Sequence, residues 1–280
     1  MKRVLCAVVA SVLSAAAAAA AVPGGGGASA SEMCPEVAIV AARGSDQNPE
    51  HGDFLGPARY GARMSNGYEG PNIAGLLHLA EERHPGVFDD AEVLGLDEHT
   101  YPAAMNLPPL AKDGERLTSS QTTERLSSVL EEHPLPELAY GTTVGAIDSV
   151  VRGARNAPDF LHAREAVTGC HPDYIVVGFS QGAVIGTALE QKLGDRVKGA
   201  MYMGNPGPWH SPKSVNYCLS GDVICRPTVP NAVDALQTKM EVHASYFETP
   251  RATDAYFADR LAGWVKNSQE VQRAHGGRNQ

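Results

Sequence analysis

The sequence predicts an α/β fold, with a central, mostly parallel sheet that is covered by helices on both faces. Short, continuously apolar segments alternate along the chain with longer segments whose apolar residues recur at helical spacing. Strands that are buried on both faces of a parallel sheet need such continuous apolar runs. Because no internal repeat or Ser/Gly-rich linker interrupts the pattern, we predict a single domain over residues 31–268.

The expected elements follow from these two patterns in chain order. Apolar runs predict strands over 36–42, 91–96, 173–179 and 197–203. Helical spacing predicts helices over 73–83, 142–155, 181–193 and 252–265. The helix over 142–155 rests on four apolar residues that share one face, Val144, Ile147, Val150 and Val151.

Two segments do not fit the alternation. Residues 106–137 are polar, have prolines near both ends and show only a weak helical pattern over 126–130. We interpret them as an insertion that emerges from the sheet, either a lid over the site or surface decoration. Residues 269–280 are polar and contain two glycines, so we predict a polar tail there.

The first thirty residues have the pattern of a secretory signal. Met1-Lys2-Arg3 precede an apolar run from Val4 to Val22, and the segment ends in Ala28-Ser29-Ala30. An anchored membrane helix is the alternative, but alanine is weakly apolar and no basic stop-transfer signal follows. We therefore predict cleavage after Ala30 and a secreted protein without a stable membrane span, since no second apolar stretch is long enough to cross a bilayer.

Charge and cysteine content exclude several classes of protein. The chain has 23 basic and 32 acidic residues, which disfavours a nucleic-acid partner because such binding requires a basic surface. Four cysteines remain after cleavage, and in an oxidising compartment they predict two disulfides with three possible pairings. No CxxC or HExxH spacing occurs, so a zinc site has little support and we expect no metal. We also expect a monomer.

Gly178-Phe179-Ser180-Gln181-Gly182 matches the Gly-x-Ser-x-Gly pattern of a nucleophile elbow. The pattern alone is weak, but here a predicted strand leads into it and a predicted helix leads out. Such a turn exposes the serine hydroxyl and directs the following backbone N–H at a developing oxyanion. An ordinary turn with a helix-capping serine is the less favoured interpretation.

A serine nucleophile needs a histidine base and an acid that orients the histidine, and with this elbow both follow the serine in the chain. The histidines after Ser180 are His210, His243 and His275. The aspartates that follow are Asp195, Asp222, Asp234, Asp254 and Asp259. Asp222 stands out because it lies between Cys218 and Cys225, and a disulfide across them would hold it on a rigid loop.

Taken together, the motifs resemble the cutinase-like serine esterases of the α/β-hydrolase superfamily over about residues 34–265. The matching motifs are Ala42-Arg43-Gly44-Ser45, Tyr101-Pro102-Ala103, Gly169-Cys170 leading into the elbow, Cys218 to Cys225, and His243-x-x-Tyr246. The insertion over 106–137 and the longer interval between Asp222 and His243 depart from the small cutinases. These departures favour lipids or long-chain esters over cutin as the substrate.

The resemblance implies Ser180 as nucleophile, His243 as general base and Asp222 as the orienting acid. It implies an oxyanion hole made by Ser45 and the backbone N–H of Gln181. It also implies the pairings Cys34–Cys170 and Cys218–Cys225, and a loop-anchoring role for Arg43. Ser45 would otherwise be interpreted as a simple turn or cap residue.

We therefore expect a secreted carboxylic-ester hydrolase that acts on an ester or lipid substrate through an acyl-enzyme, without a cofactor. Alternatives are a phospholipase, a thioesterase or an acyltransferase acting on long-chain envelope lipids. A non-catalytic lipid- or wall-binding protein is a further alternative, although binding alone would not require a nucleophile, an acid and a base together.

Overall fold

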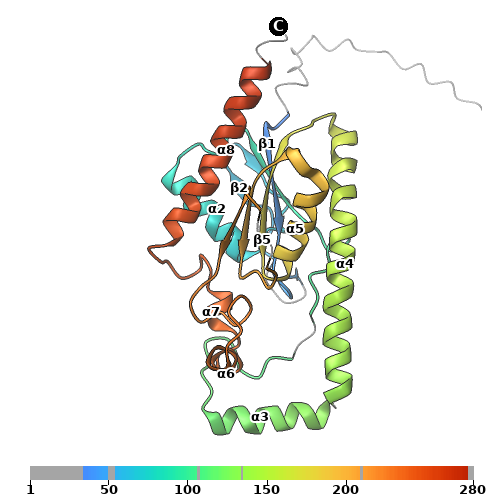
Figure 1. Cartoon of the computed structure of the whole chain (residues 1–280), viewed down its shortest axis with the longest axis vertical. Coiled ribbons are helices and arrows are strands. Elements are labelled where there is room, and N and C mark those ends of the chain that lie inside the picture. The colour runs from blue at the N-terminus through green and yellow to red at the C-terminus, as the bar shows by residue number, and fades with distance from the viewer. Residues whose placement is uncertain (1–33, 50–53, 106–107, 134, 209–210, 277–280) are drawn as a thin grey trace, which may run out of the picture. The chain divides into compact units, whose positions relative to one another are not determined.

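The computed structural model describes residues 34–49, 54–105, 108–133, 135–208 and 211–276. The expected signal segment and His210 lie outside these residues. The central sheet has five parallel strands in the order β4-β1-β5-β6-β7 (Figure 1). Its strands are β1 (Val37–Ala42), β4 (Ala91–Gly95), β5 (Asp173–Phe179), β6 (Val197–Met203) and β7 (Ser214–Tyr217). The predicted α/β class with a parallel sheet is confirmed.

In the described part of the chain, four helices cover the sheet, two on each face (Figure 1). They are α2 (Pro71–Arg83), α4 (Leu135–Thr168), α5 (Gln181–Leu193) and α8 (Asp254–Gly276). The remaining elements are the hairpin β2 (Arg59–Tyr60) and β3 (Arg63–Met64), the short 3-10 helix η2 (Gly194–Arg196), and the helices α3 (Ser119–Glu132), α6 (Val229–Gln237) and α7 (Glu241–Ala244). Among the described helices, none is both long enough and apolar enough to cross a membrane.

Alternate residues of the central strands pack against opposite helix layers. Ile39 and Val177 belong to the apolar cluster that includes α2 and α8, whereas Val40 and Val176 belong to the cluster that includes α4 and α5. Every residue of β1 and β5 is buried, as the continuous apolar runs predict. Burying one Val or Ile side chain contributes about 1.5–3 kcal/mol to stability. Because these strands bury side chains on both faces, this burial stabilises the sheet between its two helix layers.

Helix α4 packs through only part of the apolar face that its sequence presents. Val144, Ile147 and Val151 are 45%, 57% and 57% exposed, whereas Val150 packs against the core. The helix approaches α5 closely at Gly153, where a Cβ atom would lie 2.7 Å from Ile185 Cδ1. The predicted helix over 142–155 is confirmed, and α4 extends beyond it at both ends.

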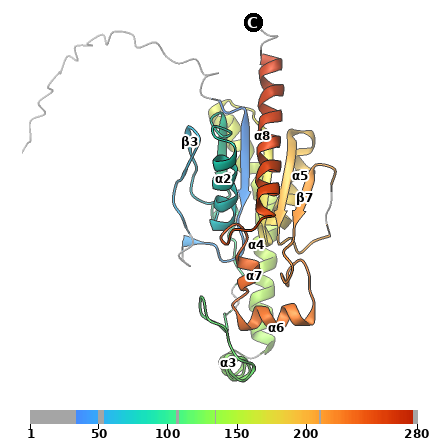
Figure 2. The same cartoon turned by 90° about the vertical axis from the view of Figure 1, so that its left-hand side faces the viewer.

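The segment predicted as an insertion contains α3 and the beginning of α4. Helix α3 begins at a capping box in which Thr118 and Gln121 satisfy each other's backbone N–H groups. None of its residues is buried, and it contacts α6. In both views α3 and α6 lie beyond the carboxyl ends of the strands (Figure 1 and Figure 2). A lid function for this segment stays a prediction.

Residues 269–276 of the predicted polar tail are helical, because α8 continues to Gly276. Gln269 is buried and its amide donates to Val87 O at 3.3 Å. Arg273 pairs with Glu36 and Asp90, which precede β1 and β4. These polar side chains hold the end of α8 against the segments beside the sheet. The polar composition of the segment does not reveal such contacts.

Two disulfides stabilise different parts of the fold. Cys34–Cys170 joins the segments that precede β1 and β5, and Cys218–Cys225 closes the short loop after β7. These are the pairings that the resemblance implies. By loop entropy the long bridge contributes about 5 kcal/mol and the short one about 2.5 kcal/mol.

Candidate active site

The turn between β5 and α5 has the geometry of a nucleophile elbow. Ser180 adopts φ 54° and ψ −121°, a strained conformation for a residue other than glycine. A Cβ atom on Gly178 would lie 2.6 Å from Ala183 Cα, and one on Gly182 would lie 1.9 Å from Ala42 O. Both glycines are therefore sterically required, and the second brings the beginning of α5 against the end of β1.

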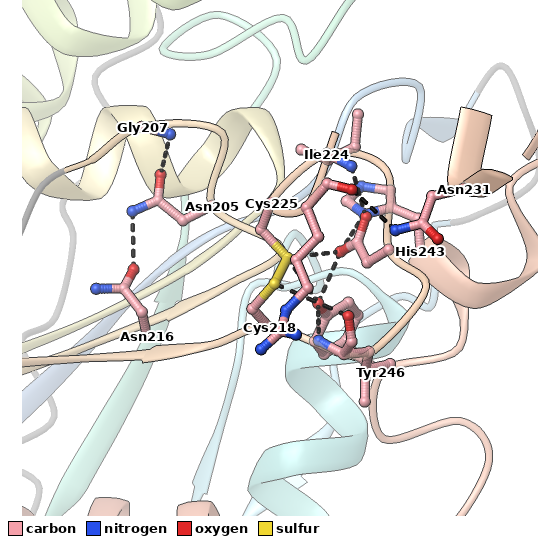
Figure 3. The surroundings of a disulfide bond; sticks show 12 residues. Asn205, Gly207, Asn216, Cys218, Ile224, Cys225, Asn231, His243 and Tyr246 are labelled. Atoms are coloured by element: carbon pink, nitrogen blue, oxygen red, sulfur yellow. Dashed lines mark hydrogen bonds and ion pairs between the residues drawn. A yellow bond between two sulfur atoms is a disulfide. The ribbon is translucent and has the colours of Figure 1, made fainter. Parts of the chain in front are cut away.

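Asp222, on the loop that follows β7, and His243, in the short helix α7, form a buried pair. Figure 3 shows His243 and Tyr246 near the Cys218–Cys225 disulfide. The imidazole Nδ1 lies 3.0 Å from each carboxylate oxygen of Asp222. Tyr246 Oη donates to Asp222 Oδ2 at 2.7 Å, and the Ile224 N–H donates to Oδ1 at 2.8 Å. The carboxylate is fully buried, and all of its neighbours named here can donate a hydrogen bond to it.

Two opposing effects set the pKa of Asp222. Burial alone would raise this pKa, but the hydrogen bond and charge of His243, with the donors from Tyr246 and Ile224, outweigh burial and lower it. The carboxylate is therefore ionised at neutral pH. An ionised partner at Nδ1 holds the proton on that nitrogen and leaves Nε2 free to accept one.

Tyr246 is a site residue whose contacts the sequence did not reveal. Its hydroxyl accepts from the Leu219 N–H at 2.9 Å and donates to Asp222, so it joins the beginning of the Asp222 loop to the carboxylate. Burial, and then the nearby Asp222 charge, raise the pKa of this phenol, which keeps it a donor. The spacing from His243, three residues along a helical turn, is the one signal that associates it with the base.

The imidazole of His243 lies beside the elbow. It stacks on the Phe179 ring at a centroid distance of 4.9 Å, and a Cβ atom on Gly204 would lie 2.6 Å from its Cε1. Ser180 follows Phe179, and its N–H donates at 2.8 Å to O of Met203, which precedes Gly204. Among the described residues no hydrogen bond joins Ser180 Oγ to the imidazole. Such bonds often tighten only when substrate binds.

Two donors predicted for the oxyanion hole have no acceptor within the described part of the chain. The Ser45 hydroxyl is buried and forms no hydrogen bond with the described residues. The N–H of Gln181 is the first of α5, where no intrahelical acceptor exists and the helix dipole favours a negative charge. A buried donor without a partner is costly and rare, so it calls for a functional reason.

The side chain of Gln181 is engaged elsewhere, which leaves its backbone N–H as the available group. Its Oε1 accepts from Tyr101 Oη at 2.8 Å and from Ser149 Oγ at 3.0 Å.

Arg43 is buried and donates to Gln47 O at 2.6 Å, Asn48 Oδ1 at 2.6 Å and Tyr101 O at 3.1 Å. These bonds give Arg43 the loop-anchoring contacts that the resemblance implies.

The other candidate acids have partners away from His243. Asp195 pairs with Lys213, Asp234 with Arg116, Asp254 with Tyr217, and Asp259 with Arg83 and His84. Among the candidate bases, His210 and the side chain of His275 lie outside the described part of the chain. In the described ranges, no three His, Cys, Asp or Glu side chains lie together in a way that could hold a metal ion.

No family model matches the sequence, and the search of curated proteins found no match either. The solved structures to which the chain is similar include two cutinase-type proteins. One is a Trichoderma reesei cutinase in complex with a C11Y4 phosphonate inhibitor, with 16% identity, 82% of this chain and 77% of that chain covered, and a TM-score of 0.35. The other is a cutinase-like protein from Cryptococcus sp., with 14% identity, 76% and 95% covered, and a TM-score of 0.38. Both likenesses are distant and concern the fold.

Proposed function

We propose that this protein is a serine hydrolase that cleaves carboxylic esters through an acyl-enzyme. The observation that carries the proposal is the buried Asp222–His243 pair beside the strained elbow of Ser180. A turn that only served the fold would not need a strained serine next to an oriented imidazole. A serine that acts as a nucleophile needs both.

In the proposed reaction Ser180 Oγ attacks the ester carbonyl carbon while His243 Nε2 takes the hydroxyl proton. The resulting imidazolium is stabilised by Asp222, which stays ionised. His243 then gives the proton to the leaving alcohol as the C–O bond breaks. Water attacks the acyl-enzyme, His243 again serves as base, and the carboxylic acid and free Ser180 are released.

The negative charge that develops on the carbonyl oxygen is assigned to the Ser45 hydroxyl and the Gln181 N–H. This assignment is supported because neither donor has an acceptor among the described residues. A preorganised donor of this kind typically contributes about 2.7–4 kcal/mol to transition-state stabilisation. No metal or organic cofactor is required for this chemistry.

We also propose that the protein is exported. The two disulfides support this, because such bonds persist mainly in oxidising compartments. Cleavage after Ala30, a single domain over 31–268 and a monomeric state stay predictions.

Labelling with a fluorophosphonate probe tests the proposal. We expect covalent labelling of the wild type, loss of labelling in Ser180→Ala, and normal labelling in Ser127→Ala, which changes an exposed serine of α3. A correctly folded wild type that does not label would contradict the hydrolase proposal and favour the lipid- or wall-binding alternative.

Hydrolysis of p-nitrophenyl esters from acetyl to palmitoyl then tests the substrate class, with Ser180→Ala as the blank. We propose lipids or long-chain esters, so we expect turnover to rise with chain length. A preference for acetyl or butyryl esters would instead indicate an open site and a decorative insertion over 106–137. Detection of transfer to an added alcohol would favour the acyltransferase alternative.

A further inference from the structure

One chain of side-chain amides connects the loop after β1 to the turn that carries His243. The Gly44 N–H donates to Gln47 Oε1 at 2.8 Å, and Gln47 Nε2 donates to Asn72 Oδ1 at 2.6 Å. Asn72 Nδ2 donates in turn to Ala244 O at 2.6 Å and to Tyr246 O at 2.9 Å. Gly44 precedes Ser45 and Ala244 follows His243, so each end lies one residue from a proposed catalytic group.

The direction of every hydrogen bond in this chain is fixed by its ends. Two backbone carbonyls at one end require the NH₂ group of Asn72, which turns its oxygen toward Gln47. A backbone N–H at the other end requires the oxygen of Gln47, which turns its NH₂ group toward Asn72. Each amide therefore has one suitable orientation, and the chain acts as a rigid link rather than as interchangeable polar contacts.

Burial and close packing support this link. Asn72 is fully buried in the first turn of α2. A Cβ atom on Gly70 would lie 2.7 Å from Gln47 Oε1 and 2.9 Å from Arg43 Cβ, so the loop lies directly on the beginning of the helix. Burying an amide is costly unless it is hydrogen-bonded, and an apolar side chain would fill the same space without that cost.

We propose that Gln47 and Asn72 are positioning residues, which set the separation between the Ser45 hydroxyl and the His243 imidazole. This inference rests on the proposed function. One substrate carbonyl must meet both groups, since the oxyanion donor binds its oxygen while the base serves the attacking serine. A misplacement of about 1 Å can lower the rate about 10²-fold.

The link complements two others that the site already contains. Tyr246 and Asp222 set the position of the imidazole relative to its acid. Arg43 holds the loop over 43–48 through Asn48 and the carbonyl oxygen of Tyr101. Removing Gln47 therefore leaves the loop folded and the Asp222–His243 pair intact, and it disturbs the relation between the oxyanion donor and the base.

Steady-state kinetics with p-nitrophenyl butyrate tests the proposal on Gln47→Met, which keeps the size of the side chain and removes both amide bonds. We expect kcat to fall about 10- to 100-fold with KM nearly unchanged. The matched control is Asn66→Leu, because the Asn66 amide makes two similar bonds to the backbone of Gly95 at 2.7 and 2.8 Å. That control should keep its kcat whatever it loses in thermal stability.

Asn72→Leu should show the same loss of kcat, and Gln47→Met decides the question if the buried variant does not fold. A folded Gln47→Met enzyme with wild-type kcat, or one in which only KM or thermal stability changes, would overturn the proposal. Its failure is distinguishable from failure of the proposed function, which would leave the wild type itself without turnover or fluorophosphonate labelling.

Discussion

Two aspartate–histidine pairs occur among the residues that the structure describes, and one of them has the surroundings of a catalytic pair. His84 Nε2 lies 2.8 Å from Asp259 Oδ1, and Arg83 adds two bonds of 2.8 and 2.7 Å to the same carboxylate. His243 Nδ1 lies 3.0 Å from Asp222. The distance in the Asp259–His84 pair is therefore shorter, and an arginine adds a further charge to it. The two pairs differ in burial, because the Asp259 side chain is 43% exposed and that of Asp222 is 0% exposed.

The same contact has different consequences in these two environments. The hydrogen bond from Arg83, and then that from His84, lower the pKa of Asp259 to about 2. Solvent screens such a pair, so it contributes little to stability. At Asp222 the lowering occurs against the opposing effect of burial, and the charge acts on an imidazole that is fixed beside Phe179. Surroundings therefore distinguish a catalytic pair better than distance does.

The two pairs should differ most in their effect on turnover. Asp222→Asn should lower kcat about 10⁴-fold while the fold persists, because an amide does not stabilise the imidazolium or enforce its tautomer. Asp259→Asn should leave kcat unchanged. Ester hydrolysis and circular dichroism measure the two effects. Equal kcat values in the two variants would contradict both the assignment of the acid and the comparison.

The loop that carries Asp222 is closed by a disulfide, whereas Asp259 lies within α8. Replacing Cys218 and Cys225 by serine should lower the free energy of unfolding by about 2.5 kcal/mol and also lower kcat, since Asp222 loses its rigid loop. Replacing Cys34 and Cys170 should cost about 5 kcal/mol without changing kcat at a temperature where the variant is folded. Urea unfolding and kinetics on both double variants would separate these effects, and an unchanged kcat in the first would show that the short bridge does not position the acid.

The third contrast concerns the hydroxyl that supports Asp222. Tyr246→Phe should lower the free energy of unfolding by about 1–3 kcal/mol, because the buried Leu219 N–H loses its acceptor. We also expect a lower kcat, because the carboxylate loses one of its donors. Tyr256→Phe, at a tyrosine that is 60% exposed, is the control and should change neither quantity. Wild-type stability and kcat in Tyr246→Phe would contradict the proposal that this hydroxyl supports Asp222.

The sequence predicts one part of this site well and other parts poorly, for a physical reason. The strand, the elbow at Ser180 and the following helix are encoded by consecutive residues, and β5 and α5 have the predicted bounds. Asp222 could be favoured because two cysteines flank it. The links made by Gln47 and Asn72 join residues as many as 174 positions apart, and no local pattern records such contacts. The helical spacing over 142–155 predicts α4, but it does not reveal that Val144, Ile147 and Val151 are exposed while Val150 packs against the core.

The smallest contrast should appear in the response of stability to pH and salt. Both folded pKa values lie below the unfolded value of about 4, so each charge stabilises the fold above that pH and loses this effect as the pH falls through the folded pKa, which is about 2 for Asp259. Urea midpoints at pH 7 and pH 3, in 0.05 and 1 M NaCl, can compare the wild type with Asp222→Asn and Asp259→Asn.

The difference caused by Asp259→Asn should be small and should vanish in 1 M salt, where the screening length is about 3 Å. The difference caused by Asp222→Asn should persist in salt at pH 7 and shrink at pH 3, because water and ions do not reach this carboxylate. If salt removed both differences equally, the two pairs would share one environment and burial would not explain why only Asp222 suits catalysis.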